Sequence, residues 1–411
     1  MDSMRRGRLG DVALVEISGV DKKTTDGEKP VRLCNFTDVY KNWAITAPMY
    51  ETFMVASAND KEISKFSLRR GQVAVTKDSE TRDDIGIPTY IADNFEDVLL
   101  GYHCALITPD ETKLDGKYLN AFLHSEFIQK FFSANASGSG QRYTLSVDTL
   151  NEIPIYLPSL DEQKRIGEVF SNIDRKIEIN RQINDYLAAM ARQLYDYWFV
   201  QFDFPDEKDG KPYKSSGGKM LWDEKVKRQI PDGWKSVTLQ DFLTIKNGKD
   251  HKHLKDGKYP VYGSGGMMRK VESFLFSGES VLFPRKGSLN HIMYVNEPFW
   301  TVDTMFYTEM KIPSVAKYIY YSVNGIDFTG LDSGTGVPSM TSTTLYSIKL
   351  IRPKGSILKS FDERVQPWFD TIEKNSSEIE RLTKIRDELL PMLMNGQVSV
   401  KPLNNHLSPS H

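Results

Sequence analysis

Residues 160–198 read LDEQKRIGEVFSNIDRKIEINRQINDYLAAMARQLYDYW, and this stretch decides the fold. From Ile166 to Trp198, a mainly apolar set of residues recurs at alternating steps of four and three. This spacing places the set on one side of an α-helix and is typical of a coiled-coil seam. We therefore predict a helix over about 161–199 that packs lengthwise against a second helix.

The same pattern returns 195 positions later, from Phe361 to Leu393. The match extends upstream of the helices, because Leu150 and Leu345 are also separated by 195 residues. One offset that holds over more than forty residues indicates an internal repeat. The seam positions expected to pack together are Ile173, Ile177, Asn180, Leu187 and Leu194 in the first helix and Trp368, Ile372, Asn375, Leu382 and Leu389 in the second.

The segment before each helix is rich in β-branched and aromatic residues and is punctuated by Gly, Pro and Asn-Gly. Such segments fold as α/β or mainly β domains. The predicted fold class is thus α/β (α+β): two globular domains separated by two long helices that form an antiparallel coiled coil, with a pseudo-two-fold internal repeat. We place the first domain at 1–158, the first helix at 159–200, a linker at 201–232, the second domain at 233–353, the second helix at 354–396 and a tail at 397–411.

Asn180 and Asn375 lie in the middle of their helices. In an antiparallel pair they would meet at the pseudo-two-fold axis, where a buried polar pair fixes register and direction. The alternative is that both are exposed and lie off a drifting seam.

The second helix contains two prolines. Pro367 predicts a kink or a late start, and Pro391 predicts a frayed or bent last turn. Gly396 is the expected stop of this helix.

Composition limits the class of protein. The formal net charge is −2, so any contact with nucleic acid must come from local basic patches or from partner proteins. The two cysteines, Cys34 and Cys104, are too few for a disulfide framework and suit a reducing compartment. The sequence has no signal-peptide pattern and no run of about 20 apolar residues, so we expect a cytoplasmic protein without membrane contact.

One basic segment stands out, KNGKDHKHLKDGK at 246–258. Lysines at regular intervals in a loop suit contacts with phosphates, although a solvated loop has the same composition. Lys22 and Lys23 form a weaker equivalent in the first domain. The candidates in the basic segment are Lys246, Lys249, His251, Lys252 and His253.

Further candidates lie at turns. Arginine has the best shape for guanine edges, but it is also a common surface cation. The glycine-rich loops at 137–144 and 333–340 are equivalent in the repeat, and their side chains differ, so the two loops could contact different base sequences. The glycines could also serve only to shape a turn. The turn candidates are Arg69, Arg70, Lys77, Arg82, Arg269, Arg285 and Lys286, and the loop candidates are Gln141, Arg142, Tyr143 and Ser339.

Motifs for catalysis and metal binding are weak. Asp206 and Asp223 with Lys225 match a loose nuclease pattern, but they fall in a Lys/Gly/Ser-rich linker, whereas that chemistry needs a rigid sheet. His251 and His253 have no third ligand nearby. We therefore expect no catalytic residues and no metal site.

Two stretches resemble a known family, the specificity subunits of type I restriction-modification systems. Residues 157–202 resemble the family's central conserved region, with a Leu-Pro-x-Leu-x-Glu-Gln-x-x-Ile opening and a closing Trp-Phe. Residues 386–400, RDELLPMLMNGQVSV, resemble its second conserved region. The entry to the second domain at Pro231–Trp234 also fits, so the resemblance covers nearly the whole chain.

The resemblance implies a function without catalysis. Each globular domain would read one half of a split site in double-stranded DNA, and the helices would set the distance between the halves. Two methyltransferase subunits and the restriction (motor-nuclease) subunits would be its partners. The chain would need no cofactor, because S-adenosylmethionine, ATP and Mg would be bound by those partners.

Two other hypotheses belong to different classes. One is a scaffold that does not bind DNA, whose two heads bind proteins and whose coiled coil serves assembly. The other is a solitary enzyme built on Asp206 and Asp223.

Overall fold

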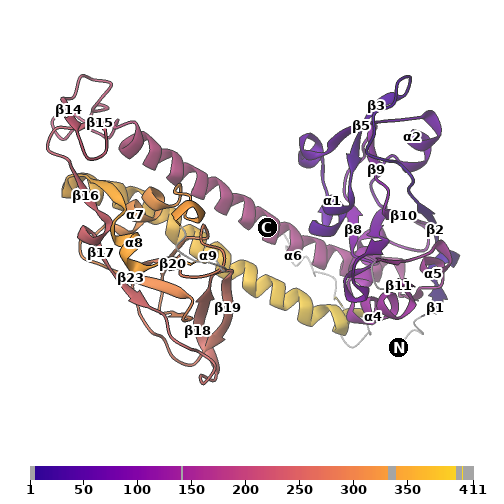
Figure 1. Ribbon diagram of the computed structural model, residues 1–411. Coiled ribbons are helices and arrows are strands. Elements are labelled where there is room, and N and C mark those ends of the chain that lie inside the picture. Colours follow the sequence, from indigo (N-terminus) through magenta and orange to yellow (C-terminus); the bar gives the residue numbers. More distant parts are fainter. Residues whose placement is uncertain (1–4, 140–141, 332–338, 395–399, 401–411) are drawn as a thin grey trace, which may run out of the picture. The chain divides into compact units, whose positions relative to one another are not determined.

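The computed structural model describes residues 5–139, 142–331, 339–394 and 400 (Figure 1). The chain divides into two compact units. Unit 1 comprises residues 1–181 and 376–411, and unit 2 comprises residues 182–375. Two long helices, α6 (Leu160–Tyr195) and α9 (Gly355–Met394), each contribute one part to each unit.

Unit 1 contains a mixed α/β domain, here called head 1, that runs from β1 to β13. Its main sheet has five strands in the order β2-β10-β6-β8-β4, and a smaller sheet has the order β5-β3-β9. Its elements are β1 (Arg5–Arg8), η1 (Leu9–Asp11), β2 (Ala13–Ile17), β3 (Lys29–Cys34), α1 (Phe36–Lys41), β4 (Ala44–Ile45), η2 (Ala47–Thr52), β5 (Met54–Ala58), α2 (Asp60–Phe66), β6 (Val73–Thr76), β7 (Asp78–Ser79), η3 (Arg82–Asp84), β8 (Pro88–Ile91), β9 (Val98–Leu100), β10 (Cys104–Pro109), α3 (Gly116–Leu123), α4 (Glu126–Asn135), β11 (Ser137–Ser139), β12 (Arg142–Thr144), α5 (Val147–Asn151) and β13 (Pro154–Leu157).

Unit 2 contains the corresponding domain, head 2, that runs from β16 to β24. Its main sheet has the order β17-β23-β20-β21, and its smaller sheet has the order β19-β18-β22. After the last part of α6, the unit continues with a π-helical turn and a hairpin. Its elements are η4 (Asp196–Val200), β14 (Met220–Asp223), β15 (Arg228–Pro231), β16 (Lys235–Thr238), η5 (Leu239–Asp241), β17 (Leu243–Asn247), β18 (Asp256–Gly263), β19 (Gly266–Val271), β20 (Glu279–Pro284), β21 (Met293–Asn296), β22 (Trp300–Thr301), β23 (Met305–Met310), α7 (Ala316–Val323), η6 (Thr329–Leu331), α8 (Ser342–Tyr346) and β24 (Lys349–Arg352).

The two heads share one topology. In head 1, β10 lies between β2 and β6, and in head 2, β23 lies between β17 and β20. Both smaller sheets combine one antiparallel pair with one parallel pair. In head 1, β3 is antiparallel to β5 and parallel to β9; in head 2, β18 is antiparallel to β19 and parallel to β22. The predicted mixed α/β fold with an internal repeat is therefore confirmed.

Individual hydrogen bonds repeat as well. The Leu9 N–H donates to Ile153 O, and the Leu239 N–H donates to Ile348 O, both at 2.9 Å. Ile153 and Ile348 are separated by the same 195 residues that relate the two helices.

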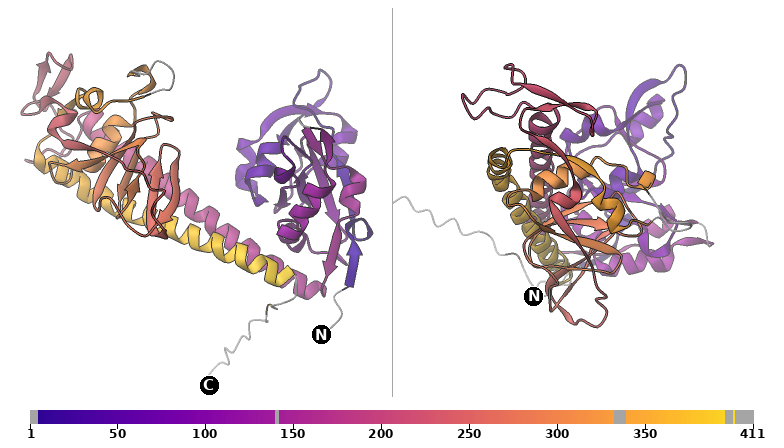
Figure 2. Two further views of the ribbon diagram at one scale, coloured as in Figure 1. Left: turned by 60° about the horizontal axis from the view of Figure 1, so that its bottom comes forward. Right: turned by 60° about the vertical axis from the view of Figure 1, so that its left-hand side comes forward.

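Within each unit, α6 and α9 pack against each other in opposite directions (Figure 2). In unit 1, the start of α6 at Ile166 shares a buried cluster with the end of α9 at Leu393. In unit 2, Ala191 and Trp198 near the end of α6 share a cluster with Phe361 near the start of α9. Asn180 meets Glu378 in unit 1, and Asn184 meets Asn375 in unit 2. Within each unit, residue numbers thus rise along α6 as they fall along α9, which is antiparallel packing.

The seam positions form the less exposed side of both helices. Ile177 and Asn180 are buried at 1% exposure each, whereas Tyr186 on the other side of α6 is 73% exposed. Towards the middle of α9 the seam is only half-buried.

The two central asparagines each make a polar contact with the opposite helix. Asn180 Nδ2 donates to Glu378 Oε2 at 2.8 Å in unit 1, and Asn375 Nδ2 donates to Asn184 Oδ1 at 2.9 Å in unit 2. Lys176 also approaches Glu378, at 3.4 Å. A direct contact between Asn180 and Asn375 stays a prediction.

The prolines of α9 do not delay or interrupt it. The helix begins at Gly355, twelve residues before Pro367, so the expected late start at Pro367 is wrong. The hydroxyl of Thr371 donates to the carbonyl of Pro367 at 2.7 Å, one turn earlier in the helix. Gly396, the expected stop, lies outside the described residues.

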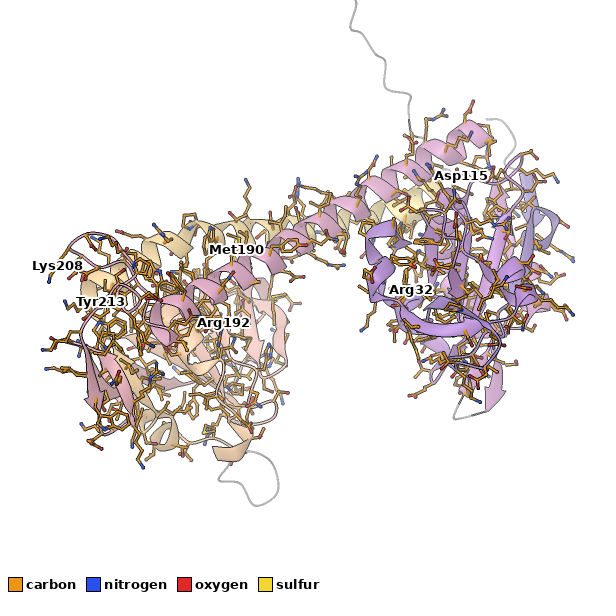
Figure 3. The ribbon with its side chains drawn as sticks, turned by 90° about the horizontal axis from the view of Figure 1, so that it is seen from above. Arg32, Asp115, Met190, Arg192, Lys208 and Tyr213 are labelled. Carbon is orange, nitrogen blue, oxygen red and sulfur yellow. The ribbon has the colours of Figure 1, made fainter. Side chains whose placement is uncertain are left out.

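The segment 201–232 differs from the bare linker that its composition predicts. Phe204 is buried and stacks between Tyr213 and Trp234, with ring centroids 4.8 and 4.9 Å away; Figure 3 labels Tyr213. The β14–β15 hairpin follows. Aromatic burial therefore folds this segment against head 2 despite its many Lys, Gly and Ser residues.

The carboxylates of the weak nuclease motif have structural roles. Asp223 accepts hydrogen bonds from the Lys225 and Val226 N–H groups and from the Ser236 hydroxyl. Asp206 accepts from the Lys208 N–H. Both carboxylates stabilise turns.

Candidate nucleic-acid interface

In head 1, Lys77 follows β6 at a junction of three chain segments. Its N–H donates to His103 O at 2.9 Å, and its carbonyl accepts from the Leu145 N–H at 2.8 Å. The backbone of Lys77 is therefore held between the residue before β10 and the segment after β12. These two bonds do not involve the side chain, so they place no restriction on the residue type at this position.

In head 2, Arg285 follows β20 and makes the same two bonds. Its N–H donates to Thr304 O at 2.8 Å, and its carbonyl accepts from the Met340 N–H at 2.9 Å. Lys77 and Arg285 thus occupy one position of the shared fold. They were predicted separately, because they are not 195 residues apart in the sequence.

The side chains around Lys77 converge on one carboxylate. Asp78 Oδ2 lies 2.9 Å from Lys77 Nζ, 2.6 Å from His103 Nδ1 and 3.2 Å from Arg142 Nη2. Burial alone would raise the pKa of Asp78, but hydrogen bonds from His103, Lys77 and Thr144 lower it to about 2. Lys77 and Arg142 are two cations around a single carboxylate, so this Asp78 cluster carries excess positive charge.

Aromatic side chains border the Asp78 cluster. The Arg82 guanidinium lies 5.0 Å from the centre of the Tyr143 ring. The Tyr102 ring lies 3.8 Å from the His103 ring. His103 has a φ of 73°, a left-handed conformation that is uncommon outside glycine and is often found at functional positions.

Sequence reasoning found part of this site. Lys77, Arg82, Arg142 and Tyr143 were candidates, and the structure brings them together. Asp78 was missed although it directly follows Lys77 in the sequence. Tyr102 and His103 were missed, because no local pattern marks residues that reach the site from the segment before β10. Gln141 lies outside the described residues.

In head 2, Arg285, Lys286 and Ser339 are neighbours. Lys286 and Ser339 form an isolated antiparallel β-bridge, and Gly287 follows with a φ of 88°. His291 Nδ1 lies 2.8 Å from Ser264 O, at the turn between β18 and β19. The Arg285 side chain is exposed, with its guanidinium 5.9 Å from the Phe306 ring.

The basic segment 246–258 lies within head 2 and runs from the end of β17 into β18. Lys246 belongs to β17 and pairs with Glu309 at 3.7 Å. Trp300 Nε1 donates to Lys249 O at 2.9 Å, and the His253 ring lies 6.1 Å from the Trp300 ring. The side chains of Lys249, Lys252 and His253 remain exposed, whereas His251 is half-buried.

Arg269 supports the far end of this segment. Its guanidinium donates to Leu254 O and lies 3.8 Å from Asp256. This candidate therefore has a structural role in β19.

The remaining candidates lie in other loops of head 1. Lys22 and Lys23 are exposed between β2 and β3. The Arg69 and Arg70 N–H groups donate to Gln72 Oε1 and Asn94 Oδ1 in the turn before β6. Among the described residues, no hydrogen bond or ion pair joins these four to the Asp78 cluster.

Equivalent edge strands of the two smaller sheets expose apolar side chains that the sequence did not mark. On β5, Met54 is 42% and Val55 61% exposed; on β19, Met267 is 54% and Met268 59% exposed. Exposed apolar side chains suit contacts with thymine methyl groups.

The described residues lack two features that mark other classes of protein. Within ranges 5–139, 142–331 and 339–394, no cluster of three or more His, Cys, Asp or Glu side chains could hold a metal ion. No helix in the same ranges is both long and apolar enough to cross a membrane.

Comparisons with known proteins agree with this arrangement. Residues 6–189 and 231–384 match the model of the type I restriction modification DNA specificity domain. The type I restriction enzyme MjaIX specificity subunit of Methanocaldococcus jannaschii is 25% identical over 323 residues, covering 70% of this chain and 70% of the relative. The type I restriction enzyme HindI specificity subunit of Haemophilus influenzae is 21% identical over 415 residues, covering 82% and 88%.

A solved structure shares the fold. The S subunit of a type I restriction-modification system from M. genitalium superposes with a TM-score of 0.63 at 18% identity, covering 96% of this chain and 97% of that chain. The chain therefore belongs to the type I restriction-modification specificity family, whose members are non-catalytic subunits that recognise DNA sequence.

Proposed function

We propose that this chain reads a split, asymmetric target in double-stranded DNA, with one half-site for each head. The observation that carries the proposal is the equivalence of Lys77 and Arg285. One fold presents a cation at the same backbone position in both heads, and the surrounding side chains differ. Two heads of equal build but different surface suit two different half-sites. The proposed divisions are 1–158 and 233–353 for recognition, 159–200 and 354–396 for the spacer helices, 201–232 for the connection and 397–411 for the tail.

The proposed contacts combine phosphate binding with base reading. Cations position the protein on the backbone, and arginine with apolar groups reads base edges. The apolar pairs Met54-Val55 and Met267-Met268 are proposed as groove contacts. The cationic and polar contacts are Lys22, Lys23, Arg69, Arg70, Lys77, Arg82, Gln141, Arg142 and Tyr143 for head 1, and Lys246, Lys249, His251, Lys252, His253, Arg269, Arg285, Lys286 and Ser339 for head 2.

The helices are proposed to set the spacing of the half-sites. The 36 residues of α6 correspond to about 54 Å at ~1.5 Å per residue. Symmetric reading heads usually address half-sites about 34–36 Å apart, one turn of DNA, or somewhat more. The spacer helices are long enough for this task.

The partners and cofactors follow from the same proposal. We infer that two methyltransferase subunits and the restriction (motor-nuclease) subunits assemble on this chain. They would supply S-adenosylmethionine, ATP and Mg, and they would share in neutralising DNA phosphates. A reader of genomic DNA works where that DNA is, so a cytoplasmic location belongs to the proposal.

Methylome sequencing of a host with and without this chain tests the proposal. We expect loss of adenine methylation at one asymmetric, interrupted motif. The control is the same strain with the chain restored. An unchanged methylome, together with protein partners captured by the isolated heads, would support the non-DNA-binding scaffold instead.

Salt dependence of DNA binding tests the contacts at Lys77 and Arg285. For Lys77→Ala and Arg285→Ala, we expect the slope of log affinity against log salt to decrease by about one. The control is Lys65→Ala, which removes an exposed lysine of α2 that pairs with Glu16. Equal slopes for all three variants and the wild type would exclude phosphate contacts at the two positions.

A further inference from the structure

The Lys317 side chain, on α7 of head 2, has no exposed surface. Lysine is among the residues least often fully buried. Its Nζ lies 2.7 Å from Glu279 Oε1 on β20 and 2.7 Å from Asp362 Oδ1 on α9. One ammonium group therefore bonds its own domain and the spacer helix at once.

Aromatic side chains enclose this ammonium group. The Tyr294 hydroxyl donates to Glu279 Oε1 at 2.6 Å. Lys317 Nζ lies 5.3 Å from the Tyr294 ring and 5.6 Å from the Phe369 ring, at distances typical of cation–π contacts. Because Phe369 is also on α9, two residues of that helix face the lysine.

Stability alone does not explain such a group. Burying an ion pair costs desolvation energy, and well-packed apolar residues of the same volume are often as stable. Ile357, Leu358, Phe361 and Val365 already supply apolar contacts between α9 and head 2. Apolar contacts have no direction, whereas charged hydrogen bonds hold their partners at fixed distances and angles.

Head 1 is attached to its helix differently. Its equivalent lysine, Lys117, lies next to Gly167, the residue 195 positions before Asp362. A Cβ atom on Gly167 would lie only 2.7 Å from the Tyr118 N atom, so helix and head are in direct contact there. Because the residue at the position of Asp362 is a glycine, α6 itself supplies no carboxylate here.

We propose that Lys317, held between Glu279 and Asp362, is a positioning residue that sets the angle at which head 2 meets α9 and thereby the half-site spacing that the protein accepts. The inference rests on the proposed reading of a split DNA site. Successive base pairs are only ~3.4 Å apart along the duplex, so a small rotation of a reading head displaces its contacts by one pair.

A variant without the three charges tests this role. Lys317→Met combined with Glu279→Gln and Asp362→Asn removes the charges without leaving one of them unpaired. The variant is produced with its methyltransferase subunits and offered duplexes that carry the natural motif or spacers one base pair longer or shorter. We expect the preference for the natural spacer to fall by about tenfold, the effect of one mismatched base pair.

Val295→Ala is the matched control. Val295 is buried in a cluster of head 2 that contains no residue of α9, so its truncation lowers stability without touching the attachment. We expect its spacing preference to equal that of the wild type. If the triple variant does not fold, the spacing preference of the single variant Asp362→Asn is measured instead. This change affects only the contact between Lys317 and α9.

Two results would overturn the inference: a natural spacing preference in the folded charge-free variant, or equal relaxation in Val295→Ala. A wild-type complex that methylates no interrupted motif would overturn the proposed function itself. The failure of the inference and the failure of the function are therefore distinguishable.

Discussion

Heads 1 and 2 share their strands but differ in what connects them. In head 1, β3 and β5 are separated by residues 35–53, which form α1, β4 and η2; in head 2, the equivalent strands β18 and β19 are joined by Ser264 and Gly265 alone. The hydrogen bonds at Leu9 and Leu239 are nevertheless the same length. The difference teaches that the strands of the two heads are alike, while the loops that connect these strands provide the variable surface.

The heads also differ in how polar groups fasten them to their helices. In unit 1, the buried amide of Gln163 on α6 accepts from the Asp115 N–H at 3.0 Å and donates to Lys113 O at 3.0 Å; Figure 3 labels Asp115. The residue 195 positions later is Leu358, which is buried among apolar side chains. The neutral amide of Gln163 thus joins head 1 to α6 by hydrogen bonds, whereas the charged Lys317 joins head 2 to α9 by ion pairs.

The largest expected effect is that of Lys317→Met alone. The change leaves Glu279 and Asp362 without their shared cation, and loss of one partner of a buried ion pair costs about 3–5 kcal/mol. Chemical denaturation should show this loss in the free energy of unfolding of unit 2. The exposed Lys359→Met on α9 serves as control and should change stability by less than about 0.5 kcal/mol. Equal stability of the two variants would show that the ion pairs contribute nothing.

Gln163→Leu should have a smaller effect. It gives head 1 the residue type found at the equivalent helix position of head 2, but it leaves the Asp115 N–H and Lys113 O without their partner. Unsatisfied polar groups of this kind cost about 1–3 kcal/mol. Thermal unfolding measures the loss, with the exposed Gln193→Leu on α6 as control. An unchanged melting temperature would mean that apolar contact alone fastens head 1.

The smallest expected effect at neutral pH is that of His124, because it develops only as the pH falls below 6.5, and it is confined to unit 1. The His124 ring stacks on Trp43 at 4.0 Å, and burial, with a smaller contribution from the charge of Arg386, lowers its pKa to about 4 from 6.5. Below pH 6.5 the unfolded chain therefore binds a proton that the folded chain does not bind until about pH 4. Stability should fall across this window by up to about 1.4 kcal/mol per pH unit.

His124→Gln should make the stability of unit 1 less dependent on pH between 6.5 and 4. His253→Gln, an exposed histidine of head 2, is the control. An equal pH dependence in the wild type and His124→Gln would contradict the assignment.

The sequence was informative where structure is local. The three–four spacing from Ile166 to Trp198 predicted α6, because helix periodicity acts over a few residues. The Asp78 cluster was only partly predictable, since His103, the residue before β10, is 25 residues away from Asp78 in the chain.

By itself, the sequence determined the duplication, the two helices and the mixed α/β class, because repetition and periodicity are properties of the chain. Only the tertiary structure decided that Lys77 and Arg285 are equivalent and that Lys317 is buried between two carboxylates. The physical reason is that insertions change the spacing along the chain without changing position in the sheet, and burial depends on neighbours that the folded strands and helices bring together.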